Sequence, residues 1–342
     1  MKMSLLQEMR RHMGGVREMK IGWVEVLKKA YGETMYTGMA QSALSELHQV
    51  EIINVGLDHF RGYLYPKILS RLCRIAGEKD LWIRNFDSVI TLPFDRTKGK
   101  NIAMIFHIDH SFQPAYFKPC FAILEGIFYR HLKRVDAIVT ISKYWQNHFL
   151  ERNFDRVYLI YNGYDMAPFR FEAGEIEAFK ERWGLNAKPI VYLGNCQRIK
   201  GVVEACEKLK DLDVHLVTSG RKEVDIPAVN LSLDYRDYLR LLRSSSVVVT
   251  MSRFREGWNR TAHEAMLCKT PVIGSGLGGM RELLEGGGQV ACEDLNDLRE
   301  HVAYALDHPE TGENGFEFAR QFTVERFNSE WVRLVERVNE ER

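Results

Sequence analysis

The sequence lacks a long apolar segment. No uninterrupted apolar stretch of about 18 residues occurs in the 342-residue chain, which argues against a transmembrane helix. The first nine residues contain neither the apolar core nor the small-residue cleavage site of a signal peptide. We therefore expect a cytoplasmic protein, and a contact with the inner face of the membrane remains an open alternative.

Paired cysteines and a strong net charge are also lacking. The six cysteines show no CxxC spacing, which indicates buried thiols in a reducing compartment and not a disulfide framework or a zinc site. A net charge of +1 argues against a nucleic-acid partner. The first 168 residues carry 23 Lys and Arg against 17 Asp and Glu, so this half is weakly basic. That imbalance fits an anionic acceptor or a membrane surface, and it is also small enough to be incidental.

Apolar strand-like runs alternate with amphipathic helical stretches, which predicts an α/β protein with parallel sheets. In the first half we expect strands at 2–6, 50–55, 88–92, 102–106, 137–141 and 157–160, with helices at 16–31, 62–75, 117–135 and 143–152. In the second half we expect strands at 189–193, 214–219, 229–231, 246–251, 270–274 and 288–291, with helices at 202–209, 235–243, 261–268, 279–284 and 295–307. A charged stretch at 171–184 joins the two series, and the pattern at 327–342 predicts an amphipathic final helix.

Two carboxylates follow the apolar run Val247–Met251. Glu256 lies in a glycine-containing turn, and Glu264 lies eight residues later in the predicted helix. Polar groups at the carboxyl end of a parallel strand, next to the free N–H groups of a helix start, are typical of a ligand site in such sheets. Carboxylates beside an anion site suggest a ligand with both phosphates and hydroxyls, as in a nucleotide-sugar. Two glutamates at this spacing also occur by chance on surface helices.

Glycine patterns stand at two more helix entrances. Lys200 lies six residues after Gly194, which ends a predicted strand, and it directly precedes Gly201. Gly14-Gly15 precedes another predicted helix. Glycines allow the backbone to approach a phosphate closely, although an ordinary turn explains the pair at 14–15 equally well. The loop 274–279 is also rich in glycine, which by itself indicates only a turn.

Polar side chains end the apolar run at 102–106. The period of a strand would place His107 and Asp109 on one face, which permits a metal site. No further ligand cluster is evident, so we expect no metal and regard a structural role for these groups as the alternative.

Taken together, the string from Glu256 to Gly274 resembles the signature of the retaining family-4 glycosyltransferases. The resemblance covers nearly the whole chain and is most specific between residues 189 and 288. It implies the GT-B fold, in which two Rossmann-like domains with parallel sheets face each other across a cleft. The first domain would comprise 1–168 and a returning C-terminal helix at 325–342, and the second would comprise 169–324. Asn162-Gly163 resembles the crossover between the two.

The resemblance also assigns roles to individual residues. It implies catalytic roles for Glu256, His107 and Lys200. The donor-binding set implied by the resemblance comprises Gly14, Gly15, Arg198, Trp258, Asn259, Arg260 and Glu264. In this assignment Glu256 meets hydroxyls of the donor sugar, Glu264 meets the ribose, and Lys200 clamps the diphosphate together with backbone N–H groups at 258–260. His107 lines the sugar pocket, with His110 as the alternate.

The sequence departs from the family pattern at two positions. Asn195 stands where the family has an arginine that clamps the diphosphate, and our hypothesis is that Arg198 substitutes; an exposed arginine without a ligand is the alternative. Asn259 stands where glycine is usual, so a side chain there would reshape the sugar pocket.

The interpretation that follows is transfer of a hexose-type sugar from a nucleotide diphosphate sugar to a hydroxyl acceptor, with retention of configuration and no metal or other cofactor. The acceptor is left open among a glycan, a lipid-linked molecule and a small molecule. A nucleotide-sugar 2-epimerase and a degenerate, non-catalytic binding subunit are the alternatives. Basic stretches with aromatic residues at 60–74 and 129–134 suit an anionic lipid surface, or are ordinary solvated helix faces.

Overall fold

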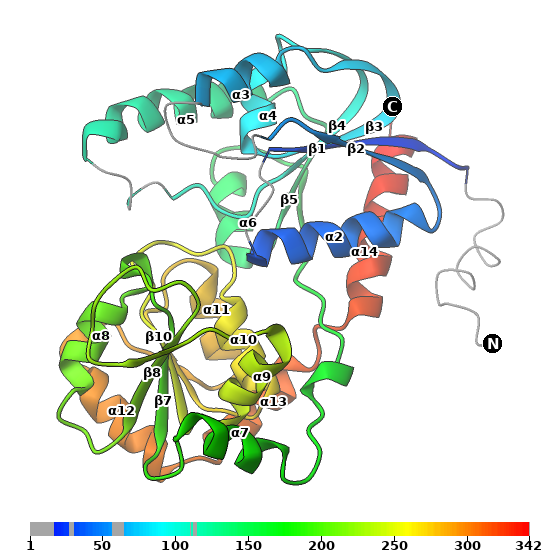
Figure 1. The fold of residues 1–342 in the computed structure, drawn as a ribbon. Coiled ribbons are helices and arrows are strands. Elements are labelled where there is room, and N and C mark those ends of the chain that lie inside the picture. The colour runs from blue at the N-terminus through cyan, green and yellow to red at the C-terminus, as the bar shows by residue number, and fades with distance from the viewer. Residues whose placement is uncertain (1–16, 27–30, 57–64, 110, 112–114, 342) are drawn as a thin grey trace, which may run out of the picture. The chain divides into compact units, whose positions relative to one another are not determined.

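The computed structural model describes residues 17–26, 31–56, 65–109, 111 and 115–341. The chain divides into two compact units (Figure 1), Met1–Gly163 with Thr323–Arg342, and Tyr164–Phe322. The division follows Gly163, in the Asn-Gly pair that resembles a crossover. Each unit is built on a six-stranded parallel sheet. No helix in the described part of the chain is long and apolar enough to cross a membrane.

The first unit has the strand order β2-β1-β3-β4-β5-β6. Its strands are β1 (Lys20–Glu25), β2 (Gln49–Asn54), β3 (Ala76–Arg84), β4 (Arg96–Met104), β5 (Ala137–Thr140) and β6 (Val157–Leu159). Its helices are α2 (Tyr31–Ser45), α3 (Tyr65–Leu72), α4 (Phe86–Thr91), the short η2 (Ala115–Phe117), α5 (Lys118–Leu132), α6 (Lys143–Leu150) and α14 (Val324–Glu340). In Figure 1, α3, α4 and α5 lie on one face of this sheet, and α2 and α14 lie on the other.

Several predictions for the first unit are wrong. The strand expected at 88–92 is helix α4, because Asn85 accepts a hydrogen bond from Ser88 N at 3.0 Å while the Ser88 hydroxyl accepts one from Asn85 N at 2.9 Å. This reciprocal capping box fixes a helix start that periodicity alone did not reveal. Strand β1 lies inside the region expected as a helix at 16–31, and β3 was not predicted. The strand expected at 2–6 lies outside the described residues.

The final helix packs on the first unit, as predicted. The Trp331 ring of α14 lies 5.7 Å from that of Trp23 in β1. Phe327 and Trp331 also meet the ring of Tyr36 in α2, and all four aromatic side chains are buried. Burying each large aromatic ring contributes about 1.5–3 kcal/mol. The last segment of the chain therefore completes the core of the first unit.

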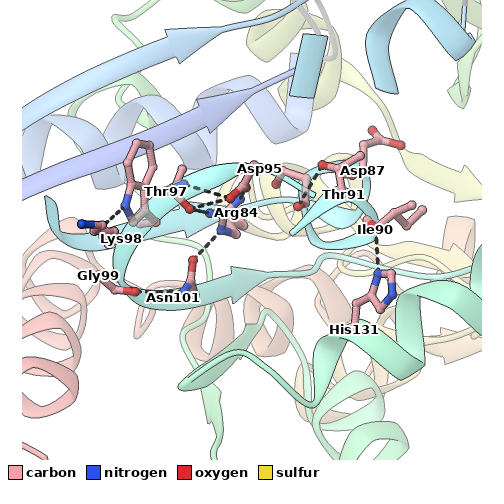
Figure 2. A network of polar contacts seen from close by, with 12 residues as sticks. Arg84, Asp87, Ile90, Thr91, Asp95, Thr97, Lys98, Gly99, Asn101 and His131 are labelled. Atoms are coloured by element: carbon pink, nitrogen blue, oxygen red, sulfur yellow. Dashed lines mark hydrogen bonds and ion pairs between the residues drawn. The ribbon is translucent and has the colours of Figure 1, made fainter. Parts of the chain in front are cut away.

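A buried arginine ties β3 to β4 (Figure 2). Arg84 donates from Nε to Asn101 Oδ1 at 2.5 Å, from Nη1 to Asp95 Oδ2 at 2.7 Å and from Nη2 to Thr97 Oγ1 at 2.6 Å. Its guanidinium group also lies 5.7 Å from the ring centre of Trp82. The Arg84 and Asp95 side chains are almost wholly buried. Burying a charge costs free energy unless the charge is paired and hydrogen-bonded, and these contacts offset that cost.

The second unit has the strand order β12-β11-β10-β7-β8-β9. Its strands are β7 (Ile190–Asn195), β8 (His215–Ser219), β9 (Val229–Leu231), β10 (Val247–Thr250), β11 (Val272–Gly274) and β12 (Val290–Ala291). Its helices and short turns are η3 (Ala167–Phe169), α7 (Glu175–Trp183), η4 (Arg198–Lys200), α8 (Val202–Leu209), α9 (Tyr235–Ser244), α10 (Arg260–Leu267), α11 (Gly279–Gly286), η5 (Leu295–Asp297), α12 (Leu298–Asp307) and α13 (Thr311–Ala319). All six predicted strands of this unit are confirmed, whereas α7, in the charged stretch, and α13 were not predicted.

Candidate functional site

The strand order of the second unit places a switch point beside β7. Strand β7 pairs with β8 on one side and with β10 on the other side. The strands that follow β7 in the chain are therefore divided between its two sides. In open α/β sheets the crevice beyond the carboxyl ends of the strands at such a point binds ligands. The loops after β7, β10 and β11 carry most of the residues that the sequence singles out.

Gly201 allows the loop after β7 to lie against the end of β10. Gly201 has a φ of +71°, and a Cβ atom there would lie 2.0 Å from the carbonyl oxygen of Met251. Arg253 N also donates to Ile199 O at 3.0 Å, so the two loops are joined through their backbones. No other residue fits at position 201 without moving the backbone, and this close approach brings Lys200 next to the loop after β10.

Lys200 and Glu256 form an ion pair. Lys200 Nζ lies 2.7 Å from Glu256 Oε1, and the Ser252 hydroxyl donates to the same carboxylate oxygen. The Glu256 side chain is 6% exposed and that of Lys200 is 29% exposed. The ammonium group also lies 5.0 Å from the ring centre of Phe254. The predicted phosphate clamp and the predicted sugar-binding carboxylate are thus direct neighbours.

The glycine-rich loop after β11 positions the backbone of Glu256. Gly279 N donates to Glu256 O at 2.8 Å, and Gly278 pairs with Glu256 as an isolated parallel bridge. A Cβ atom at Gly278 would lie 2.4 Å from that carbonyl oxygen, and its φ of +68° also favours glycine. The loop therefore has a specific task in this fold beyond that of a turn.

Asn259 caps α10. Its side-chain oxygen accepts a hydrogen bond from Ala262 N at 2.8 Å, and the residue is buried. Asparagine is among the best N-cap residues because it satisfies one of the orphan N–H groups of the first turn. The side chain is turned towards the helix, so one N–H group at this helix start is already occupied. The expectation that this side chain reshapes a sugar pocket stays a prediction.

A buried histidine holds Trp258. The indole N–H donates to His263 Nδ1 at 3.0 Å, and His263 Nε2 lies 3.1 Å from Ala319 O. The ring is therefore the Nε2–H tautomer, and burial lowers its pKa to about 3, which keeps it neutral. Sequence reasoning did not single out His263, because in the sequence it is one more polar residue of a helix.

Glu264 accepts from three side chains. Arg260 Nη2 lies 2.8 Å from Oε1, the Tyr235 hydroxyl donates to Oε1 at 3.3 Å, and the Tyr238 hydroxyl donates to Oε2 at 3.1 Å. Burial in the first place, and Glu264 in the second, raise the pKa of Tyr238, so its hydroxyl remains a donor at neutral pH. Sequence reasoning missed both tyrosines.

Arg260 and Tyr164 have unsatisfied buried atoms. Within the described part of the chain, neither Arg260 Nη1 nor the Tyr164 hydroxyl has a hydrogen-bond partner. The guanidinium group of Arg260 lies 4.9 Å from the ring centre of Tyr164, which stacks on His263 at 4.0 Å. Unsatisfied buried donors are rare in folded proteins, so this group has capacity to bind a further acceptor.

The hypothesis on Arg198 concerns an exposed side chain. Arg198 begins η4, two residues before Lys200, and its side chain is open to solvent. Asn195 is exposed as well, and its Oδ1 accepts from the Ser219 hydroxyl at 3.3 Å. The hypothesis that Arg198 clamps the diphosphate in place of the arginine that the family has at position 195 stays a prediction.

The remaining predicted site residues belong to the first unit. Strand β4 ends at Met104, so His107 and Asp109 lie in the following loop, where His107 is exposed and Asp109 is buried. The expectation that a strand places these two on one face is therefore wrong. Among the described residues, no group of three or more His, Cys, Asp and Glu side chains is arranged to hold a metal ion. Gly14, Gly15 and His110 lie outside the described residues.

The first unit has a small cavity at its own switch point. It has a volume of about 130 Å³ and lies beside the carboxyl ends of β1, β2 and β3. Glu25, Asn54 and Asn85 supply polar groups, and Trp23 and Met104 supply apolar ones. A larger hollow of about 410 Å³ lies beside α8 in the second unit and is lined by none of the predicted residues.

Comparison with known proteins bears on both units. An uncharacterized glycosyltransferase of Methanocaldococcus jannaschii is 28% identical over 211 residues, which make up 56% of this chain and 56% of that protein. The chain thus aligns with about half the length of that relative. Anabaena HepE, solved in complex with UDP-glucose, superposes with a TM-score of 0.69 at 16% identity and covers 93% of this chain and 99% of its own. Sucrose-phosphate synthase from Thermosynechococcus elongatus gives 0.74 at 17% identity, with 93% and 98% covered.

The family comparison agrees with the motifs. Residues 187–308 match the family model described as Glycosyl transferases group 1. This segment contains the loop with Lys200, the Glu256 to Glu264 segment and the glycine-rich loop. The predicted resemblance to glycosyltransferases is confirmed there at the level of group 1, and the structural likeness concerns the fold of both units. Residues 187–308 are thus similar to the group 1 glycosyltransferases, and the chain has the GT-B fold.

Proposed function

We propose that the protein transfers a hexose-type sugar from a nucleotide diphosphate sugar to a hydroxyl acceptor, with retention of configuration and without a metal. The observation that carries the proposal is the contact between Lys200 and Glu256 at the switch point of the second unit. A cation for phosphate and an acceptor for sugar hydroxyls lie side by side there. The start of α10 lies only four residues further along the chain.

In this proposal the donor binds to the second unit. Lys200 and the N–H groups at 258–260 stabilise the charge that develops on the leaving diphosphate. Glu256 accepts from hydroxyls of the transferred sugar, and Glu264 accepts from the ribose, since an ionised carboxylate can only accept. The leaving phosphate assists removal of the acceptor proton. UDP-glucose is the first donor to test, because HepE, which shares the fold, binds it.

The acceptor side of the proposal lies in the first unit. The cavity there presents the Glu25 carboxylate and the amides of Asn54 and Asn85 next to apolar surface. Such a combination of polar and apolar lining groups suits an acceptor whose hydroxyl groups are attached to an apolar skeleton. The role that the resemblance implies for His107 stays a prediction.

A thermal-shift screen of nucleoside diphosphates, followed by their sugars, tests the proposal. One nucleoside diphosphate should raise the melting temperature, because a ligand at 100 times its dissociation constant adds about 2.7 kcal/mol to the free energy of unfolding. The protein should then slowly hydrolyse the matching nucleotide-sugar. NMR of a transfer product should show that the sugar keeps the anomeric configuration that it has in the donor. An inverted product refutes retention, and the absence of any shift with every nucleotide refutes the donor site.

The same screen separates the alternatives. A 2-epimerase converts a free nucleotide-sugar to its isomer without any acceptor, which NMR detects directly. A non-catalytic binding subunit binds the nucleotide-sugar and leaves it intact with every acceptor. The polar surroundings of Glu264 are expected to bind a nucleotide-sugar whether the protein is a transferase, an epimerase or a binding subunit. Turnover, and not binding, therefore distinguishes these three functions.

A further inference from the structure

The cavity of the first unit is lined by polar groups that have no partner within the described part of the chain. Thr37, in the second turn of α2, is 8% exposed and lines the cavity, and its hydroxyl group takes part in no hydrogen bond there. Glu33 lies one turn earlier on the same helix and also lines the cavity, and its carboxylate accepts no hydrogen bond from the described residues. Buried polar groups in folded proteins are nearly always hydrogen-bonded, so an unpaired hydroxyl at a cavity wall indicates capacity for a ligand.

Glu25 brings a second carboxylate to the same cavity. It is the last residue of β1, and Gln41 Nε2 of α2 donates to its Oε1 at 2.6 Å. The other carboxylate oxygen accepts no hydrogen bond from the described residues. The end of β1 and the first turns of α2 therefore present two carboxylates and a hydroxyl group to one small space.

The charge around Glu33 is negative. A third carboxylate, Asp87 in the first turn of α4, accepts from the Tyr65 hydroxyl at 2.6 Å. Lost hydration, and after it the charges of Asp87 and Glu25, raise the pKa of Glu33 to about 7. In the described part of the chain, no lysine, arginine or histidine forms an ion pair with any of these three carboxylates. Neighbouring like charges oppose one another, so a cation that enters the cavity is stabilised by all three.

The other lining residues restrict the kind of cation. Trp23, Val26 and Met104 line the cavity with buried apolar side chains. They suit an alkylammonium group, which has an apolar stem and three N–H donors, better than a hydrated metal ion. Among the described residues, no group of three or more His, Cys, Asp and Glu side chains is arranged to hold a metal. A volume of about 130 Å³ accommodates one end of a larger molecule, since sites for whole ligands measure about 300–1,000 Å³.

We propose that this cavity binds the ammonium group of an acceptor that carries both a primary amine and a hydroxyl group. The inference rests on the function proposed above, in which the acceptor binds to the first unit, and it specifies the acceptor's chemical class. Glu33 and Glu25 neutralise the ammonium charge, and the Thr37 hydroxyl accepts the third N–H. The apolar side chains contact the carbon atoms next to the nitrogen. The sugar is transferred to the hydroxyl group of the same molecule, so the amine serves only in recognition.

Matched pairs of small molecules test the amine site on the full-length protein. The two members of a pair have the same skeleton and differ in an amine or a hydroxyl group: cyclohexylamine with cyclohexanol, and methyl glucosaminide with methyl glucoside. NMR titration at pH 7 measures their affinities. The amine of at least one pair should bind about 10- to 150-fold more tightly than its hydroxyl counterpart, which is the contribution of one charge-assisted hydrogen bond.

Two variants should remove this preference, each to a different degree. Glu33→Gln should lower the affinity for the amine about tenfold or more and leave that for the hydroxyl counterpart within about twofold, because the change removes a charge and little volume. Thr37→Val, which loses one neutral hydrogen bond, should lower the affinity for the amine about two- to tenfold. Glu78→Gln is the matched control and should change neither affinity: Glu78 is exposed near the start of β3, whereas the cavity lies at the carboxyl end of that strand.

Three results overturn the proposal: no binding of either amine, equal affinities within both pairs, or a preference for the amine that persists in Glu33→Gln. Lys28 and Lys29 lie outside the described residues and are the alternative source of positive charge. Amine binding that arises only when both are changed to serine also overturns the proposal, because the protein then supplies the cation itself.

Hydrolysis of the nucleotide-sugar without an acceptor separates this inference from the proposed function. If the protein hydrolyses the donor and shows no preference for amines, the transferase stands and the amine site is refuted. If amines bind through Glu33 and no nucleotide binds, the transferase is refuted, and with it the role of the amine as part of an acceptor.

Discussion

The contact between Lys200 and Glu256 allows a test in which stability and donor binding give different answers. Removing the cation in Lys200→Met leaves a carboxylate that is 6% exposed with the Ser252 hydroxyl as a remaining donor. Breaking a fully buried pair costs about 3–5 kcal/mol, and exposed pairs contribute about 0.2–1 kcal/mol. Because Lys200 is itself 29% exposed, we expect a loss of about 2 kcal/mol in the free energy of unfolding.

Neutralising the partner should restore most of that loss. In Glu256→Gln the buried group is no longer charged, and Lys200 reaches water, so the single change should cost about 1 kcal/mol. The double variant Lys200→Met with Glu256→Gln should be no more than about 1.5 kcal/mol less stable than the natural protein. The coupling energy of the cycle is then about 1.5 kcal/mol.

Donor affinity should not follow the same pattern. A charge-assisted hydrogen bond to phosphate contributes about 1.5–3 kcal/mol, so Lys200→Met should weaken binding of the nucleoside diphosphate about 10- to 150-fold. That loss should persist in the double variant, because the Glu256→Gln change restores stability and supplies no cation. Isothermal titration with the nucleotide found by the thermal-shift screen, and urea unfolding of the same four proteins, give the two quantities.

The outcome that refutes the reasoning is recovery of both quantities in the double variant. Lys200 would then only neutralise Glu256, and the phosphate clamp would have to lie elsewhere. Lys222→Met is the matched control: Lys222 forms an exposed pair with Asp225 at 2.6 Å in the same unit. It should change neither stability nor affinity by more than about 0.5 kcal/mol.

Two further predictions concern buried charges. Arg84→Met should lower the free energy of unfolding by about 3–5 kcal/mol, because Asp95 is left buried without its cation; thermal melts against the exposed-site control Arg152→Met decide this, and equal melts contradict it. For His263, the folded pKa of about 3 lies below the unfolded value of 6.5, so the neutral ring contributes stability that is complete above pH 6.5 and is lost as the pH falls. The loss between pH 6.5 and 5 should be about 2 kcal/mol and should be absent in His263→Gln, as urea unfolding at each pH will show.

The second unit was more predictable from the sequence than the first, for a physical reason. Its central strands are short apolar runs such as Val247–Thr250, buried on both faces and separated by clear turn residues. In the first unit, β3 begins with the exposed residues Ala76, Gly77 and Glu78, and β1 contains Gly22, where a Cβ atom would lie 2.5 Å from the ring of Trp82. Neither strand shows the continuous apolar pattern that identifies the others.

The candidate site was likewise predictable from the sequence only in part. The close spacing of Glu256, Asn259 and Glu264 made their neighbourhood visible in the sequence. The direct contacts of Glu256 with Lys200 and of Glu264 with Tyr235 were not visible, because Lys200 is 56 positions away from Glu256, and Tyr235 is 29 positions away from Glu264. Such pairings depend on the order of the strands in the sheet, which no local pattern specifies.

The contacts of the two glutamates also narrow their role. Ser252 donates a hydroxyl to Glu256, and Tyr235 and Tyr238 donate hydroxyls to Glu264, while each carboxylate has one cation beside it. Both carboxylates therefore already accept hydrogen bonds from hydroxyl groups. A carboxylate that receives sugar or ribose hydroxyls exchanges one hydroxyl donor for another. The arrangement therefore favours a binding role at both positions, and Glu264→Gln should weaken nucleotide binding more than it lowers the turnover number at saturating donor.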